Sequence, residues 1–498
     1  MKKVKATCLW LLGGVFVLLV IFSCSGKNES MAYKAEQRLF KARKMKNELV
    51  GSRFNEDFFE RTKREYQRLI NDFSNSRSDS REIDGIVVSA QMDLAELDYR
   101  AGLLDSSIIE FKKAAAIADN FPDARGNALY SIAAISEEMQ KKNEAINYYE
   151  QFYNEFLKEI DLSRAPSMNS SYFTAPLKLA QLTRDAGDMA GSAQWLKKAE
   201  NLYNKILSSA SDTTLLKATR LNLLTAYLEG KRWDRALQWA EDIEKEAGPE
   251  EAPAIEFIIA RIYRDGKGDK SLAYERFMKI YKKFPESNEA PLALLAAAGI
   301  DRARGKTEEA TKLYEKVLKE YPTNSPAAIE AEWNIAEIDE SQNKWVEASL
   351  RYKSIYSNYP TSLEGFEAPI RIMKNYLKKG EKDAAAAAYK QAVEHYKKME
   401  KQELPIEPRI LAAEYLVRAM VEFGDWQKAV ETLVSLPDIY PQYENFKANY
   451  LYAASICETE LKDRGRAEKI LTRCIEKYPG SEVAKEAKKQ LDRLRSIR

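Results

Sequence analysis

The sequence predicts an all-α protein, an α-solenoid of about ten to eleven helical hairpins closed by a C-terminal capping helix. Two observations support this fold class. A short motif of alanine, a large side chain and proline recurs at nearly constant spacing through the second half of the chain. The chain of 498 residues is also too long for one compact core, which favours several domains or an array of repeats.

The N-terminal segment has the composition of a secretory signal. Lysines occupy positions 2, 3 and 5, and the stretch from Ala6 to Phe22 that follows carries no charge. These 17 residues are marginal for a membrane-spanning helix and suit the apolar core of a signal peptide. The segment therefore predicts export of the chain.

Ser23 followed by Cys24, at the end of this apolar stretch, resembles the lipobox of bacterial lipoproteins. The resemblance implies that the thiol of Cys24 is diacylglycerylated, that the signal is cut before it, and that the new amino group is acylated. Residues 1–23 would then be the signal peptide, and residues 24–30 a lipid-anchored spacer. The alternative is a plain anchor helix or signal peptide in which Cys24 is incidental.

The remaining chain divides into helical segments. Residues 31–89 are expected to form a degenerate N-terminal hairpin, with helices over residues 31–49 and 55–73. Weaker repeats follow over residues 90–250, and clearer repeats that end in Tyr-Pro or Phe-Pro occupy residues 251–480.

Each clear repeat carries alanine, then an aromatic residue or leucine four positions later, then proline twelve positions after the alanine. The copies are Ala273/Phe277/Pro285, Ala310/Tyr314/Pro322, Ala348/Tyr352/Pro360, Ala429/Leu433/Pro441 and Ala467/Leu471/Pro479. The steps between neighbouring alanines, 273 to 310, 310 to 348 and 429 to 467, are 37, 38 and 38 residues. Each step is long enough for one helical hairpin.

Helix packing explains the pattern. A small residue lets two antiparallel helices approach closely, and a large residue four positions on fills the space beside it. Glycine at the turn is expected to supply the positive φ angle that ends the first helix. Proline after the second helix cannot continue it and fixes the exit into the next hairpin.

The run LNLLTAYLEGKRWDRA at positions 221–236 resembles the first helix, turn and second-helix start of a tetratricopeptide repeat. The resemblance extends over about residues 90–480. It implies a right-handed superhelix whose first helices line a concave groove. The groove-facing positions that it implies are Leu221 and Thr225 in one hairpin, and Trp333 and Glu337 in another.

Two features depart from the usual 34-residue tetratricopeptide period. The period here is 37 to 43 residues, and aromatic-proline pairs such as Tyr321-Pro322 recur at the repeat ends. This longer form is similar to the repeats of outer-membrane lipoproteins, including the helical lipoprotein of the β-barrel assembly machinery and the Tol-Pal-associated coordinator protein.

Residues 481–498 are expected to form the capping helix. Its apolar positions fall on one side, with lysine and arginine elsewhere, as a polar cap on a last repeat requires. These apolar positions are Val483, Ala487, Leu491 and Leu494.

The composition disfavours nucleic-acid binding and most catalytic chemistry. The chain has 78 basic and 76 acidic side chains, so it lacks the excess of positive charge that marks nucleic-acid binders. His395 is the one histidine, although histidine is the commonest metal ligand and proton shuttle. We therefore expect no catalytic residue, no metal site, no cofactor and no small-molecule substrate, and interpret His395 as a packing or surface residue.

Gly305-Lys306-Thr307 ends like a phosphate-binding loop, but that motif requires glycine where Ile300 stands. The segment also joins two predicted helices, whereas a phosphate-binding loop joins a strand to a helix. It is interpreted as a repeat turn.

Cys457 and Cys474 are expected on the two helices of one hairpin. Packing as small buried residues is the first interpretation. A disulfide is the alternative, since an exported protein meets an oxidising compartment and facing helices can bring two sulfurs together.

The sequence thus predicts a non-enzymatic, membrane-anchored scaffold that binds other envelope proteins or peptides. Its expected location is the bacterial outer membrane, facing the periplasm and held by the N-terminal lipid anchor. The alternative is a surface-exposed lipoprotein that acts as an adhesin or host-contact protein. The same anchor serves both faces of an outer membrane, so the residues leave these two functions open.

Overall fold

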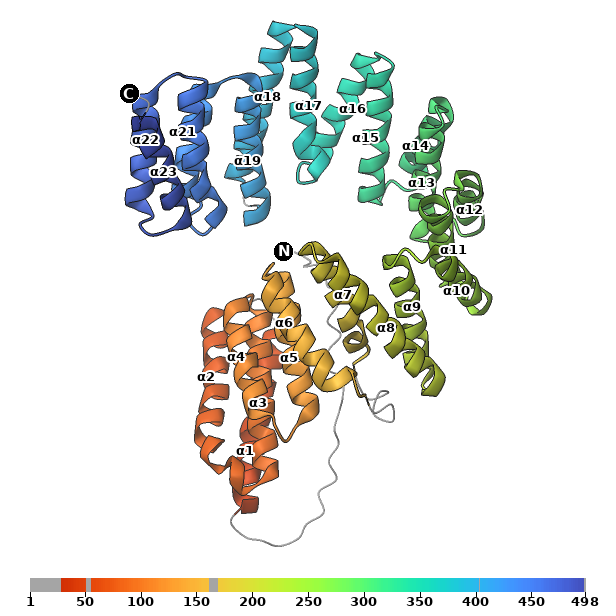
Figure 1. Ribbon diagram of the computed structural model, residues 1–498, viewed down its shortest axis with the longest axis vertical. Helices are drawn as coiled ribbons and strands as arrows, with labels where there is room; N and C mark the ends of the chain where they lie inside the picture. Colours follow the sequence, from red (N-terminus) through yellow and green to blue (C-terminus); the bar gives the residue numbers. More distant parts are fainter. Residues whose placement is uncertain (1–27, 51–54, 161–168, 403, 497–498) are drawn as a thin grey trace. The chain divides into compact units, whose positions relative to one another are not determined.

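The computed structural model describes residues 28–50, 55–160, 169–402 and 404–496 (Figure 1). The predicted signal peptide, Cys24 and residues 25–27 of the predicted spacer lie outside this range. The described residues contain 23 α-helices and no strand, which confirms the all-α class.

The chain forms two compact units, one ending at Glu246 and the other beginning at Ala247. Within each unit, consecutive helices pair as hairpins that follow one another in chain order (Figure 1). The helices pair as α1 with α2 through α21 with α22, which makes eleven hairpins, and α23 follows as a cap. The predicted α-solenoid with a C-terminal capping helix is confirmed.

Unit 1 contains five hairpins. Its helices are α1 (Asn28–Val50), α2 (Glu56–Phe73), α3 (Arg81–Arg100), α4 (Leu104–Ile117), α5 (Pro122–Glu138), α6 (Lys142–Phe152), α7 (Ala175–Asp185), α8 (Met189–Ser209), α9 (Thr213–Glu229) and α10 (Trp233–Glu246). Short helical turns η1 (Ser74–Asp79), η2 (Tyr153–Leu157) and η4 (Ser170–Thr174) connect or extend them.

Unit 2 contains six hairpins and the cap. Its helices are α11 (Ala252–Arg261), α12 (Lys270–Lys283), α13 (Glu289–Ala303), α14 (Thr307–Glu320), α15 (Ser325–Ser341), α16 (Trp345–Asn358), α17 (Leu363–Lys379), α18 (Lys382–Lys401), α19 (Ile406–Phe423), α20 (Trp426–Ile439), α21 (Asn449–Thr459), α22 (Arg464–Lys477) and α23 (Glu482–Ser496). The turns η5 (Ile262–Gly266) and η6 (Glu444–Ala448) complete it.

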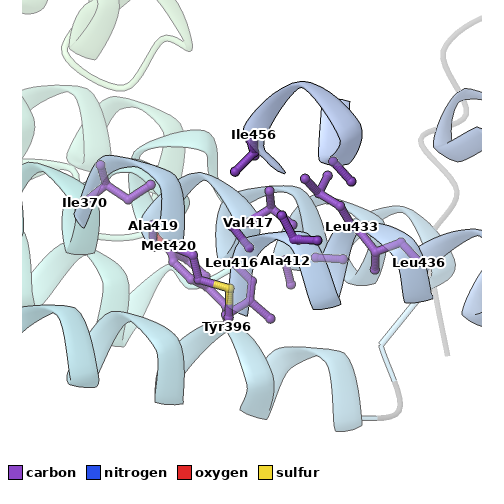
Figure 2. Close-up of a cluster of buried hydrophobic side chains, with 14 of the residues drawn as sticks. Ile370, Tyr396, Ala412, Leu416, Val417, Ala419, Met420, Leu433, Leu436 and Ile456 are labelled. Carbon is purple, nitrogen blue, oxygen red and sulfur yellow. The ribbon is translucent and has the colours of Figure 1, made fainter. Parts of the chain in front are cut away.

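The repeated alanine and the large residue after it form the core of each hairpin. Ala310 and Ala348 have no exposed surface, and Tyr314 and Tyr352 are almost fully buried beside them. Figure 2 shows the same arrangement farther along, where side chains of α17, α18, α19, α20 and α21 meet around Leu416 and Leu433. The motif therefore marks the helix contacts that hold successive hairpins together.

The first helices of neighbouring hairpins also contact one another. In unit 2, α11 contacts α13, α13 contacts α15 and α17 contacts α19. First helices that contact the first helix of the next hairpin are more closely spaced than helices that make no such contact. The first helices therefore form the inner layer of the stack. We call the surface of this layer the first-helix face.

The turns within the hairpins have one residue with positive φ in every hairpin from the second to the last. These residues are Gly102, Gln140, Gly187, Lys231, Gly268, Gly305, Asn343, Gly380, Gly424 and Lys462. The expectation of glycine is thus wrong at four turns. In the α9–α10 turn, Gly230 has φ −78° and Lys231 takes the positive angle, φ 52°.

Lys231→Gly is expected to stabilise the protein. A residue with a Cβ atom in the left-handed region costs roughly 1 kcal/mol, which glycine avoids. The free energy of unfolding, measured with urea, should rise by about 0.5–1 kcal/mol, allowing for the entropy that glycine adds to the unfolded chain. Gly305→Lys, the reverse change at the matching turn, should lower it by a similar amount; a loss of stability in Lys231→Gly would contradict the argument.

Candidate functional site

Ion pairs connect successive first helices of unit 2. Arg302 on α13 donates from Nη2 to Glu337 Oε2 on α15 over 3.0 Å, and from Nη1 to Asn334 Oδ1 over 2.6 Å. One hairpin on, Arg371 of α17 donates from Nε to Glu340 Oε2 of α15 over 3.0 Å. Polar side chains therefore bridge α13 to α15 and α15 to α17.

The same arrangement continues between α17 and α19. Arg418 donates from both terminal nitrogens to the carboxylate of Glu367, over 2.5 and 3.0 Å. Lys374 donates to Glu422 over 2.9 Å. Single half-exposed ion pairs contribute about 0–1 kcal/mol each, so their main effect here is to fix the spacing of the first helices.

Unit 1 has equivalent bridges on its own first helices. Lys178 of α7 donates to Glu137 of α5 over 2.8 Å, and Arg184 of α7 pairs with Glu229 of α9 over 2.6 Å. The first-helix faces of both units are thus rich in charge of both signs, and much of that charge is satisfied within the protein.

A hollow of about 420 Å³ lies on the first-helix face at the start of unit 2. Its volume falls within the roughly 300–1,000 Å³ typical of ligand pockets. Its apolar lining comes mainly from α13, in Leu292, Leu295, Ala296, Gly299, Ile300 and Ala303, with Phe257 of α11. Its polar lining is Arg264, Lys270, Tyr314, Glu330 and Asn334, from η5, α12, α14 and α15.

Gly299 keeps this hollow open. It lies inside α13 without a positive φ, and a Cβ atom built there would meet no atom within 4 Å. Glycine inside a helix is destabilising by roughly 0.5–1 kcal/mol relative to alanine. Packing does not require glycine at this position, so its effect is to leave helix backbone accessible beside Leu292, which is 41% exposed.

The charges around the hollow are partly unpaired. The carboxylate of Glu330 and the ammonium of Lys270 have no ion-pair partner among the described residues, whereas Arg264 pairs with Asp265 over 2.7 Å. Burial, and then the nearby carboxylate of Glu364, raise the pKa of Glu330. Burial raises the pKa of Tyr314 to about 12, so its hydroxyl stays neutral. An apolar floor with free charges of both signs can bind a peptide segment.

Leu221 and Thr225 lie one turn apart on α9, in unit 1. Leu221 is 46% exposed, and Thr225 is exposed with its hydroxyl donating to the Leu221 carbonyl over 2.9 Å. The two side chains therefore share one accessible helix face.

Trp333 and Glu337 lie on α15, in unit 2. The half-buried Trp333 ring packs edge-to-face on Tyr352, with ring centroids 5.0 Å apart. Glu337 is bound by Arg302. Both residues are therefore engaged within the protein, next to the hollow lined by Asn334.

The histidine and the two described cysteines, whose side chains could have chemical roles, are packed inside the protein. His395 of α18 packs against Tyr356 and Tyr396, and burial followed by Lys398 lowers its pKa, so it is neutral at pH 7. Cys457 and Cys474 are free thiols with no exposed surface, and burial raises the pKa of Cys474 to about 11. This agrees with packing and not with a disulfide.

The described part of the chain contains no group of three or more His, Cys, Asp or Glu side chains placed to hold a metal ion. Gly305-Lys306-Thr307 forms the α13–α14 turn and the start of α14, as a repeat turn should.

No helix within the described ranges combines the length and apolar character needed to cross a membrane.

Two segments of the chain, residues 292–324 and 449–481, match the tetratricopeptide repeat family. They cover the α13–α14 and α21–α22 hairpins. Repeats of this type generally mediate contacts between proteins. No curated protein matches the chain.

Among solved structures, the chain is similar to a tetratricopeptide repeat protein from Parabacteroides merdae, with 13% identity over 60% of this chain and 99% of that one and a TM-score of 0.38. It is also similar to yeast Tom70, with 14% identity over 93% and 96% of the two chains and a TM-score of 0.34. A third is the C-terminal part of a TPR repeat-containing protein from Cytophaga hutchinsonii, with 18% identity over 56% and 98% and a TM-score of 0.34.

Proposed function

We propose that this chain is a membrane-anchored tetratricopeptide-repeat lipoprotein that holds a partner protein in the bacterial cell envelope. The anchor is Cys24, through the lipobox resemblance of the residues before it. The partner site is the hollow on the first-helix face of unit 2. The protein acts by binding and has no catalytic role.

The open hollow at Gly299 is the observation that carries the proposal. Ion pairs bridge much of the first-helix face, and Arg302 binds Asn334 at the edge of the hollow. The hollow also offers exposed Leu292, accessible backbone, and two charges without an ion-pair partner in the described part of the chain. A partner segment with an apolar side chain would fill the floor, and its polar groups would meet Lys270 and Glu330 at the rim. Burial of apolar surface at the centre of a polar rim is the usual arrangement of a protein interface.

Gly299→Leu tests this function. The helix accepts leucine, a Cβ atom at this position meets no atom within 4 Å, and the hollow has room beyond it, so the variant should fold normally while its side chain fills the hollow. We expect capture of the partner to fall about tenfold or more, which corresponds to ~1.4 kcal/mol. The measurement is photocrosslinking in living cells from a benzophenone amino acid at Leu292, followed by mass spectrometry.

Two controls make the result specific. Gly465→Leu is the same substitution at an exposed glycine of α22, far along unit 2, and should leave capture unchanged. The crosslinker at Val346, which is 68% exposed on the second helix α16, should not capture the same partner. Equal capture from both positions, or capture that Gly299→Leu does not reduce, would rule out the hollow as the binding site.

Protease treatment of intact cells separates the periplasmic scaffold from a surface-exposed adhesin. Digestion only after lysis supports the scaffold. Digestion in whole cells would assign the protein to the outer surface.

A further inference from the structure

Helix α1 has an outer face that the rest of the described chain leaves uncovered. Its inner face is fully used, because Ala32, Ala35 and Leu39 pack against α2 and α3. On the outer face, Tyr33 is 61% exposed and Phe40 is 73% exposed. The two residues are seven positions apart, which is two helical turns, so both rings lie on the same side.

The cations of α1 divide into two groups. Arg38 and Lys41 pair with carboxylates of α2, and Arg43 and Lys46 pair with carboxylates of α3. Lys34, beside Tyr33, and Lys44, one turn beyond Phe40, have no ion-pair partner among the described residues. The exposed Glu36 and Gln37 lie between the rings. The outer face therefore combines two aromatic rings with these two ammonium groups and with two exposed carboxylates, those of Glu36 and of Glu48, one turn beyond Lys44.

The chain before α1 limits how far this face can be from a membrane. Three residues, 25–27, separate Cys24 from Asn28, where α1 begins, so four residue-to-residue steps join the two. An extended chain spans at most about 3.6 Å per residue, so about 14 Å is the greatest distance between the anchor and the start of the helix. This step rests on the proposed anchor at Cys24. A tether this short gives the outer face a high effective concentration at the bilayer surface.

We propose that the outer face of α1, formed by Tyr33, Phe40, Lys34 and Lys44, lies on the phospholipid bilayer that holds the anchor. Aromatic rings favour the interface between headgroups and acyl chains. Lysine side chains at the edges of such a face extend their ammonium groups toward lipid phosphates. The contact fixes the first hairpin against the membrane.

The test uses the full lipidated protein in vesicles of phosphatidylethanolamine and phosphatidylglycerol. A fluorescent, polarity-sensitive probe is attached to Gln37→Cys, which lies between the two rings. The matched control is Gln67→Cys on α2, an exposed glutamine of the same hairpin. Cys457 and Cys474 are fully buried and should not react with the probe.

The probe at position 37 should emit at shorter wavelength and lose about half or more of its intensity to spin-labelled lipids, while the probe at position 67 should not respond. Tyr33→Ser with Phe40→Ser should return the position-37 emission to its value in water. Both substituted side chains are exposed, so stability should change by less than about 0.5 kcal/mol.

Three outcomes are distinguishable. If the protein is not acylated at Cys24 and does not join the vesicles, the proposed anchor fails. If it is anchored but positions 37 and 67 respond alike, the bilayer contact is overturned. If emission at position 37 shifts only at high protein density and spin-labelled lipids do not quench it, α1 pairs with a second copy of the chain, and the bilayer contact is again overturned.

Discussion

Gly365→Ala is expected to destabilise unit 2 by about 3 kcal/mol, the upper end of the penalties for overpacking. Gly365 lies in the first turn of α17, and a Cβ atom there would be 2.1 Å from the carbonyl oxygen of Tyr359 and 3.2 Å from the Cα atom of Pro360. Both are backbone atoms of the connection from α16, so no side-chain rotation can relieve the clash. The helix or the connection must move.

Hydrogen exchange of the purified protein measures this effect locally. Amides of α16, α17 and α18 should lose protection, because these helices pack directly on the displaced turn. Gly299→Ala is the matched control, since it adds the same methyl group inside α13 where no atom lies within 4 Å. That control should keep or gain about 0.5–1 kcal/mol. Equal stability of the two alanine variants would refute the steric explanation.

Cys24→Ala is expected to abolish acylation completely and to release or mislocalise the protein. Each methylene buried in a bilayer contributes about 0.8 kcal/mol, so loss of the acyl chains removes the whole anchor. Fatty-acid labelling and the mass of the N-terminal peptide report the change. The helical units should remain folded, because Cys24 is not part of any described helix, the first of which is α1 (Asn28–Val50).

Cys457→Ala is the matched control for the anchor. It removes a thiol from the buried core of α21 and should leave both labelling and membrane association intact. If Cys24→Ala is still acylated, the lipobox interpretation is wrong.

The sequence predicted the hairpin architecture because helix contact imposes a periodic demand on residue size. Ala310 and Tyr314 have their expected neighbours in the structure, since the same spacing recurs wherever two helices meet. Turn conformation was predicted less well. Lys231 takes the positive φ next to Gly230 because the angle depends on where the helix hydrogen bonds end, one residue beyond the glycine.

The hollow could not be predicted from the sequence. It depends on the missing side chain at Gly299, together with residues from α11 to α15 that are brought together only by stacking. In the sequence, Gly299 is one glycine inside an alanine-rich helix, and no repeat spacing marks it as part of a binding site. Trp333 was expected in the groove by resemblance, yet its ring also serves the hairpin core through Tyr352.

Each helix in the described chain makes its main contacts with helices of its own or the adjacent hairpin. A hairpin in the interior of a unit therefore packs mainly on its two neighbours, and a hairpin farther along does not depend on it for packing. Duplication or deletion of a whole hairpin would rejoin equivalent surfaces, so the array can change length by gene rearrangement without a new core. The three hairpins from α11 to α16, which include every residue that lines the hollow, would in this way be inherited as one block.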